Sequence, residues 1–126
     1  MKVLLDTHVV IWWFAGSRRL GSEAQRIIAA PDVELFFSAA SWWEIAIKSA
    51  LGRLDFDLPR ARQILQKNQI AMLAVTFDHG DCAATLAEHH RDPFDRMLIA
   101  QAMFEKLRLL TRDVRLKAYG PSVLCV

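Results

Sequence analysis

The chain has 126 residues, of which 53% are hydrophobic and 24% are charged, and its net charge is +2. This length fits one domain covering residues 1–126, and the apolar content excludes a disordered chain. The small charge permits a nucleic-acid partner without indicating one. No apolar stretch reaches the roughly 20 residues of a membrane span, and nothing resembles a secretion signal. Cys82 and Cys125 have no metal-binding spacing, so we expect a reduced, cytoplasmic protein.

Short apolar runs alternate with helical patterns along the whole chain. In chain order we expect a strand at 2–5, helices at 8–14 and 22–30, a strand at 33–37, helices at 39–50 and 59–69, a strand at 70–75, helices at 78–86 and 93–106, a strand at 107–110, a short helical turn after Asp113, and a strand at 122–125. Such alternation predicts a parallel sheet with helices on both faces. The expected fold is therefore a three-layer α/β/α domain with a central parallel sheet of four to five strands.

Four acidic residues lie where predicted strands end or helices begin. Asp6 follows the first strand and Asp113 follows the fourth, while Glu44 and Asp95 lie in first turns of helices. In an open parallel sheet these positions share one edge, and ligands bind there. A cluster of carboxylates is unfavourable without a cation, and oxygen ligands suit Mg²⁺ or Mn²⁺. The sequence thus offers a candidate metal site for phosphodiester hydrolysis.

Each of these acids also has a simpler explanation as a helix cap. Ser41 and Glu44 have the spacing of a capping box. Asp92 is placed to cap the helix whose first turn contains Asp95. The other two acids each precede a helical segment and could cap it. Residue patterns alone leave both explanations open.

For the histidines and the paired tryptophans, we expect a structural role before a functional one. His89 and His90 are adjacent, so they would point in different directions on a helix, and we expect no transition-metal site there. His8 is expected to pack in the first helix, although it lies close enough to the metal-binding segment to approach a substrate. The pairs 12–13 and 42–43 are tryptophans, expected mainly in the core, with one member of each exposed at a candidate interface.

Four segments carry a more specific pattern. They are LLDTHVVIWW, SAASWWEIAIKSALGRL, HHRDPFDRMLIAQA and LLTRDVRLKAYG. In this order they resemble the motifs of PIN-domain ribonucleases, and the size and layout of the chain resemble those of the VapC toxins of type II toxin–antitoxin pairs. The resemblance spans the whole chain. It implies a PIN-like fold and an endoribonuclease that cleaves RNA, transfer RNA or another structured RNA, with metal-activated water.

The resemblance also assigns metal ligands. It implies that Asp6, Glu44 and Asp95 bind Mg²⁺, for which Mn²⁺ can substitute. Asp113 would complete the site directly or through water. Asp92 is interpreted as the helix cap, and its contribution to the site stays open.

Further residues would assist these ligands. The resemblance implies that Thr7 and Thr111 support the carboxylates or the attacking water. We also consider Arg96 and Arg112 as candidates to hold phosphate groups of the RNA.

Partners follow from the same resemblance. It implies a homodimer and a VapB-like antitoxin, which together form a heterotetramer or a larger assembly. The antitoxin would wrap the toxin and direct a basic side chain to the carboxylates. The alternative is a catalytically silent PIN module that binds RNA or protein. Two other α/β classes fit less well: a response-receiver domain would pair acids after the first strand, and an aspartyl-phosphate phosphatase would have Asp-x-Asp, where this chain has Thr7 and His8.

Overall fold

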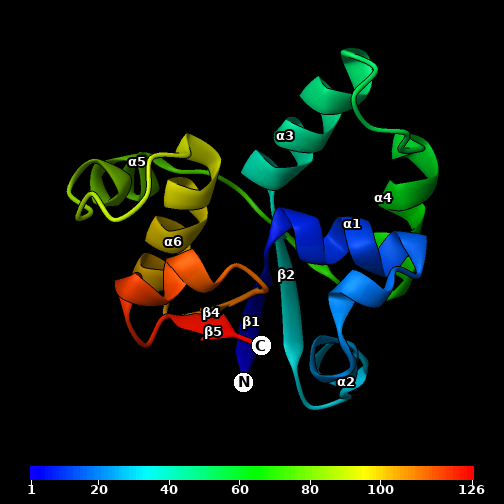
Figure 1. The fold of residues 1–126 in the computed structure, drawn as a ribbon, viewed down its shortest axis with the longest axis horizontal. Coiled ribbons are helices and arrows are strands. Elements are labelled where there is room, and N and C mark those ends of the chain that lie inside the picture. The colour runs from blue at the N-terminus through cyan, green and yellow to red at the C-terminus, as the bar shows by residue number, and fades with distance from the viewer.

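The computed structural model describes residues 1–126 and shows a five-stranded sheet between two layers of helices (Figure 1). The three-layer α/β/α fold expected from the sequence is confirmed. Most elements lie within a few residues of their predicted bounds. In chain order they are β1 (Lys2–Leu5), α1 (Thr7–Ala15), η1 (Arg18–Leu20), α2 (Ser22–Ala29), β2 (Glu34–Ser38), α3 (Ala39–Ala50), α4 (Leu58–Lys67), β3 (Ala71–Leu73), α5 (Phe77–Ala84), α6 (Pro93–Glu105), β4 (Arg108–Thr111), η2 (Val114–Tyr119) and β5 (Val123–Cys125).

The strand order creates a crevice in the middle of the sheet. The order is β3-β2-β1-β4-β5, and every neighbouring pair is parallel. The chain first builds outward from β1 through β2 to β3, and then crosses to place β4 on the other side of β1. Connections leave β1 and β4 in opposite directions at their carboxyl ends. Open α/β sheets bind ligands at such a switch point.

Alternation along β1 divides the core into two layers. Val3 and Leu5 pack into one apolar cluster with residues of α1, α2 and α3, whereas Leu4 packs on the opposite face against residues of α6 and β4. All three side chains are fully buried. Figure 1 shows α1, α2 and α4 on one side of the strands and α5 and α6 on the other. A strand buried on both faces has the continuous apolar sequence seen here.

Two helices have other caps than the sequence predicts: Ser38 rather than Ser41 for α3, which begins at residue 39 as expected, and Thr76 rather than Asp78 for α5. The chain passes from β2 into α3 without a loop, and Ser38 is the cap, because its hydroxyl accepts a hydrogen bond from the Ala40 N–H at 3.0 Å. The predicted capping box of Ser41 and Glu44 is therefore wrong, and Glu44 lies beyond the first turn. Similarly, Thr76 caps α5, one residue before the helix begins.

The start of α6 agrees with the prediction. The Asp92 carboxylate accepts hydrogen bonds from the backbone N–H groups of Phe94 at 2.8 Å and Asp95 at 3.1 Å, and Pro93 occupies the first helical position. None of the helices combines the length and apolar character that crossing a membrane requires.

Candidate active-site cleft

One cleft of about 340 Å³ contains all four acids that the sequence singled out. It lies at the switch point between β1 and β4, and the acids come from four segments: the ends of β1 and β4, α3, and the first turn of α6. Trp12 is the lone apolar residue of a lining that otherwise consists of charged groups and histidine. The full lining is Asp6, His8, Trp12, Glu44, Lys48, Asp92, Asp95, Arg112, Asp113 and Arg115.

Asp6 lies deepest in this cleft, with 5% of its surface exposed. Its Oδ2 accepts a hydrogen bond from the Thr111 hydroxyl at 2.8 Å, and its Oδ1 is buried without a hydrogen-bond partner. The side chain makes no capping bond to α1, so the capping explanation is wrong for this residue. Burial raises the pKa of Asp6 from 3.8 to about 6. A buried carboxylate oxygen with no donor is the feature that a bound cation would satisfy.

Glu44 is buried beside a positive charge. Its Oε2 accepts a hydrogen bond at 2.9 Å from Nζ of Lys48, one turn further along α3. Thr7, expected to support a carboxylate, instead donates its hydroxyl hydrogen to Ser41 Oγ at 2.8 Å. This bond ties α1 to α3, so Thr7 positions the helix that carries Glu44.

Asp95 is paired with a histidine. Its Oδ2 lies 2.8 Å from His90 Nε2. Burial raises the pKa of Asp95; the hydrogen bond to His90 opposes this shift, and the negative charges of Asp92 and Glu44 add to it. The sequence interpretation missed His90, because it treated the two histidines as neighbours on a helix and residues 88–92 form none. The His89 ring packs edge-on against Tyr119, with 5.0 Å between the ring centroids, while His90 lies beside the Asp95 carboxylate.

Asp113 is the most exposed of the four acids and serves as a cap. Its carboxylate accepts hydrogen bonds from the backbone N–H of Arg115 at 3.0 Å and from the Arg115 guanidinium at 2.7 Å. These bonds lower the pKa of Asp113. Asp113 therefore both caps the helical turn that follows it and lines the cleft.

The two arginines considered as phosphate ligands are largely committed to the protein itself. Arg112 donates to the backbone carbonyls of Arg19 at 3.1 Å and Val126 at 2.6 Å. Arg96 donates to the carbonyl oxygens of Ala83, Leu86, Ala87 and His90 and to the Tyr119 hydroxyl. Both Nη groups of Arg96 are occupied by these bonds, which leaves little of the guanidinium to hold a phosphate. It holds the segment between α5 and α6 in place.

His8 differs from its expected position, whereas the tryptophans largely agree with theirs. His8 is exposed at the rim of the cleft, where its ring lies 5.6 Å from that of Trp12. None of the four tryptophans is fully buried, and Trp43 on α3 is 63% exposed and packs edge-on against Phe94. As expected, Trp12, Trp13 and Trp42 pack against the apolar core, and Trp43 is the exposed member of its pair, whereas neither member of the 12–13 pair is exposed.

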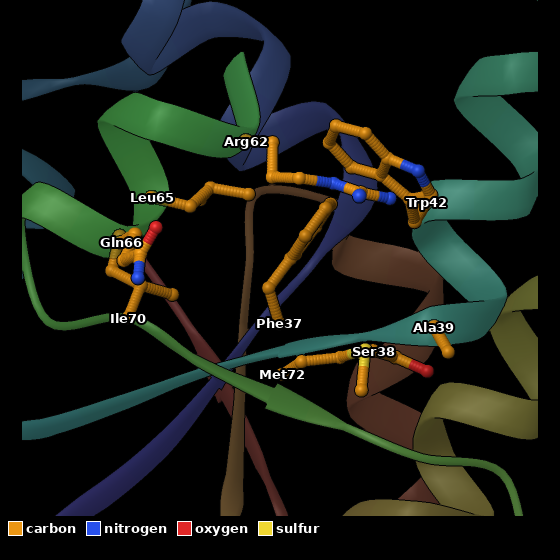
Figure 2. A pocket seen from close by; sticks show the side chains of 9 residues that line it. All are labelled: Phe37, Ser38, Ala39, Trp42, Arg62, Leu65, Gln66, Ile70 and Met72. Carbon is orange, nitrogen blue, oxygen red and sulfur yellow. The ribbon is translucent and has the colours of Figure 1, made fainter. Parts of the chain in front are cut away.

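A second, larger pocket lies away from the carboxylates. It measures about 430 Å³ and is mainly apolar. The Arg62 guanidinium carbon lies 5.7 Å from the ring centre of Trp42, and Figure 2 shows this side chain extending from α4 toward the indole on α3. The lining contains no acid, so this pocket offers no carboxylate ligand for a cation. The lining residues are Phe37, Ser38, Ala39, Trp42, Arg62, Leu65, Gln66, Ile70 and Met72.

Comparisons with known proteins agree with this geometry. The profile of the PIN domain matches residues 3–120. The chain is 33% identical to Ribonuclease VapC22 of Mycobacterium tuberculosis over 119 residues. This matched region covers 93% of this chain and 91% of that protein.

Two solved structures share the fold. One is a toxin–antitoxin complex from Klebsiella pneumoniae, with a TM-score of 0.71 and 22% identity over 97% of this chain and 95% of that chain. The other is VapBC2 from Rickettsia felis bound to a DNA fragment from its promoter, with a TM-score of 0.65 and 12% identity over 100% of this chain and 98% of that chain. The profile match and the identity to VapC22 show that this chain belongs to the PIN-domain family.

Proposed function

We propose that this protein is a Mg²⁺-dependent endoribonuclease that acts as the toxin of a toxin–antitoxin pair, with Mn²⁺ able to replace Mg²⁺. The observation that carries the proposal is the buried, unpartnered Oδ1 of Asp6 in a cleft that also contains Glu44 and Asp95. Three carboxylates in a partly desolvated cleft repel one another, and a divalent cation removes that repulsion. The relationship to a ribonuclease of the VapC type supports RNA as the substrate.

The carboxylates of Asp6, Glu44 and Asp95 would hold the ion, and Asp113 would complete the site directly or through water. Oxygen ligands of this kind suit Mg²⁺. When bound, the ion makes water a stronger nucleophile and neutralises the negative charge that develops on a phosphate.

The remaining cleft residues orient these groups and offset part of their negative charge. The Thr111 hydroxyl fixes the rotamer of Asp6 through its 2.8 Å hydrogen bond. Lys48 and Arg115 pair with Glu44 and Asp113, so together with a bound cation they would offset the negative charge of the cleft and allow a polyanion to approach. In the proposed hydrolysis, the oxygen of water bonds to phosphorus and the bond to the 3′ oxygen breaks, so the products carry a 5′ phosphate and a 3′ hydroxyl.

The test is cleavage of purified RNA with and without Mg²⁺. We expect cleavage that EDTA abolishes and that is lost in Asp6→Asn and Asp95→Asn, while Asp78→Asn, an exposed acid outside the cleft, retains it. Transfer RNA is the first substrate to try, and sequencing of the product ends identifies the cleavage site. RNA binding without cleavage in any metal would favour the silent module, and normal cleavage by Asp6→Asn would refute the site.

We also propose a homodimer and a small VapB-like antitoxin as partners. The relationship to VapC22 and the fold shared with toxin–antitoxin complexes support this. A basic side chain of the antitoxin would reach the carboxylates, and the apolar pocket beside Trp42 together with exposed Trp43 gives apolar surface for protein contacts. Because the substrate is RNA, we place this activity in the cytoplasm.

Co-expression with the product of the neighbouring open reading frame tests the partnership. We expect a stable complex in which RNA cleavage is suppressed. Failure of that product to bind the chain or to inhibit cleavage would refute the antitoxin assignment while leaving the nuclease assignment intact.

A further inference from the structure

His90 places an imidazole nitrogen beside the carboxylates of Asp95 and Asp113. His90 Nε2, a carboxylate oxygen of Asp95 and a carboxylate oxygen of Asp113 all lie within 4.8 Å of one another. We propose that these three residues form a second metal subsite, in which His90 is a direct ligand and which takes a first-row transition-metal ion in preference to Mg²⁺. This inference rests on the proposed function, because it shares Asp95 and Asp113 with the residues proposed to hold Mg²⁺, and its new element is the His90 ligand.

Asp95 joins the two sets of ligands. On one side it interacts electrostatically with Asp6 and Glu44, and on the other it lies 2.8 Å from His90. The His90 and Asp95 side chains are only 11% and 20% exposed, so both groups are already largely desolvated. The buried, unpartnered oxygen of Asp6 in the same cleft belongs to the neighbouring Mg²⁺ ligands of the proposed function.

The backbone around His90 is held in place by several hydrogen bonds, most of them partly buried. Arg96 donates a hydrogen bond to the His90 carbonyl at 3.1 Å and further ones to the carbonyls that precede it in the segment between α5 and α6. The Tyr119 hydroxyl donates to the Ala87 carbonyl at 2.9 Å. An irregular segment held at this many points presents its side chain in one position. His90 is therefore preorganised toward the carboxylates, as a ligand must be.

The donor atoms determine which ion each subsite prefers. Asp6 and Glu44 offer only oxygen, which suits Mg²⁺. The His90 subsite mixes imidazole nitrogen with carboxylate oxygen, a set that favours transition-metal ions over Mg²⁺. If His90 only donated its Nε2–H to Asp95, it would orient the carboxylate from the outer shell, and no nitrogen would contact the ion.

Binding of Co²⁺ by the full-length protein distinguishes these roles. An imidazole bound to Co²⁺ gives a hyperfine-shifted ring N–H signal in proton NMR that disappears in D₂O. We expect this signal in the wild type and in the controls His89→Gln and His8→Gln, and its loss in His90→Gln. Co²⁺ affinity should fall at least about tenfold in His90→Gln, since losing even an outer-shell partner costs about 10–100-fold, while Mg²⁺ affinity changes less.

Each outcome has a separate meaning. Circular dichroism first establishes that His90→Gln is folded. Co²⁺ binding without the shifted signal in the wild type, or a signal that is lost in His8→Gln and kept in His90→Gln, would overturn the role of His90 and leave the proposed nuclease intact. Absence of binding for both Co²⁺ and Mg²⁺ would overturn the metal site of the proposed function itself.

Discussion

The substitution Asp6→Asn measures how much the buried charge of Asp6 lowers the free energy of unfolding. Burial raises the pKa of Asp6 from 3.8 to about 6, a change of about 2 units, and each unit corresponds to about 1.4 kcal/mol. At neutral pH the metal-free protein is therefore less stable by about 3 kcal/mol than it would be with a neutral side chain at this position. Asparagine keeps the shape, and its amide oxygen can still accept the hydrogen bond from Thr111.

The sign of this effect depends on pH. Because the pKa is raised in the folded state, the folded protein binds the proton more tightly than the unfolded chain does. The stability contributed by Asp6 is therefore full below about pH 4 and is lost as the pH rises through about 6. Asparagine mimics the protonated form at every pH. We expect Asp6→Asn to be more stable than the wild type near neutral pH in EDTA. Below about pH 4, where Asp6 is protonated in both states, we expect the two proteins to be equally stable.

Urea unfolding followed by circular dichroism measures the difference. With a typical urea m-value of about 1–3 kcal/mol/M, the midpoint of Asp6→Asn should lie at least about 1 M higher at neutral pH. Added Mg²⁺ should stabilise the wild type by binding to its folded state and should leave Asp6→Asn unchanged and inactive on RNA.

The matched control is Asp113→Asn. The hydrogen bonds from Arg115 lower the pKa of Asp113, so its charge stabilises the fold above the ordinary pKa and this substitution should destabilise the metal-free protein at neutral pH. An Asp6→Asn protein that is no more stable than the wild type in EDTA at neutral pH would refute the reasoning that burial of this carboxylate is unfavourable without a cation.

Three further substitutions test the supporting contacts. Arg96→Lys should lower the free energy of unfolding by about 2–4 kcal/mol, because lysine cannot replace the five hydrogen bonds of the guanidinium; Arg91→Lys, on the exposed side of the same segment, is the neutral control in urea unfolding. Thr111→Val should cost about 1–3 kcal/mol of stability by calorimetry and slow RNA cleavage, because the buried carboxylate loses its donor. Lys48→Met removes the cation that pairs with Glu44, so calorimetric titration should show several-fold tighter Mg²⁺ binding.

Opposite results would each contradict one step of the argument. Wild-type stability of Arg96→Lys would show that the segment between α5 and α6 is held by other contacts. Full stability and cleavage in Thr111→Val would show that the rotamer of Asp6 needs no support. Weaker Mg²⁺ binding by Lys48→Met would show that the ammonium group positions Glu44 rather than competing with the ion.

Local sequence determined much of the scaffold. The apolar run Val3–Leu5 indicates a strand buried on both faces, and the structure places it in the centre of the sheet. Asp92 and Pro93 indicate a helix start, and α6 begins there. These features depend on neighbouring residues and on burial, and the sequence displays both. The four ordered motifs likewise identified the PIN family, because a family signature is itself a sequence property.

Tertiary structure decided which side chains meet. Asp6 and Thr111 are 105 positions apart and lie in hydrogen-bond contact because β1 and β4 are neighbours, and hydrophobic periodicity does not specify strand order. His90 reaches Asp95 because Arg96 holds an irregular segment whose backbone no propensity predicts. The sequence by itself thus determined the elements, the family and four candidate acids. Only the tertiary structure decided that one carboxylate oxygen of Asp6 is buried without a partner and that His90 lies beside Asp95, because both facts depend on how the chain packs rather than on local patterns.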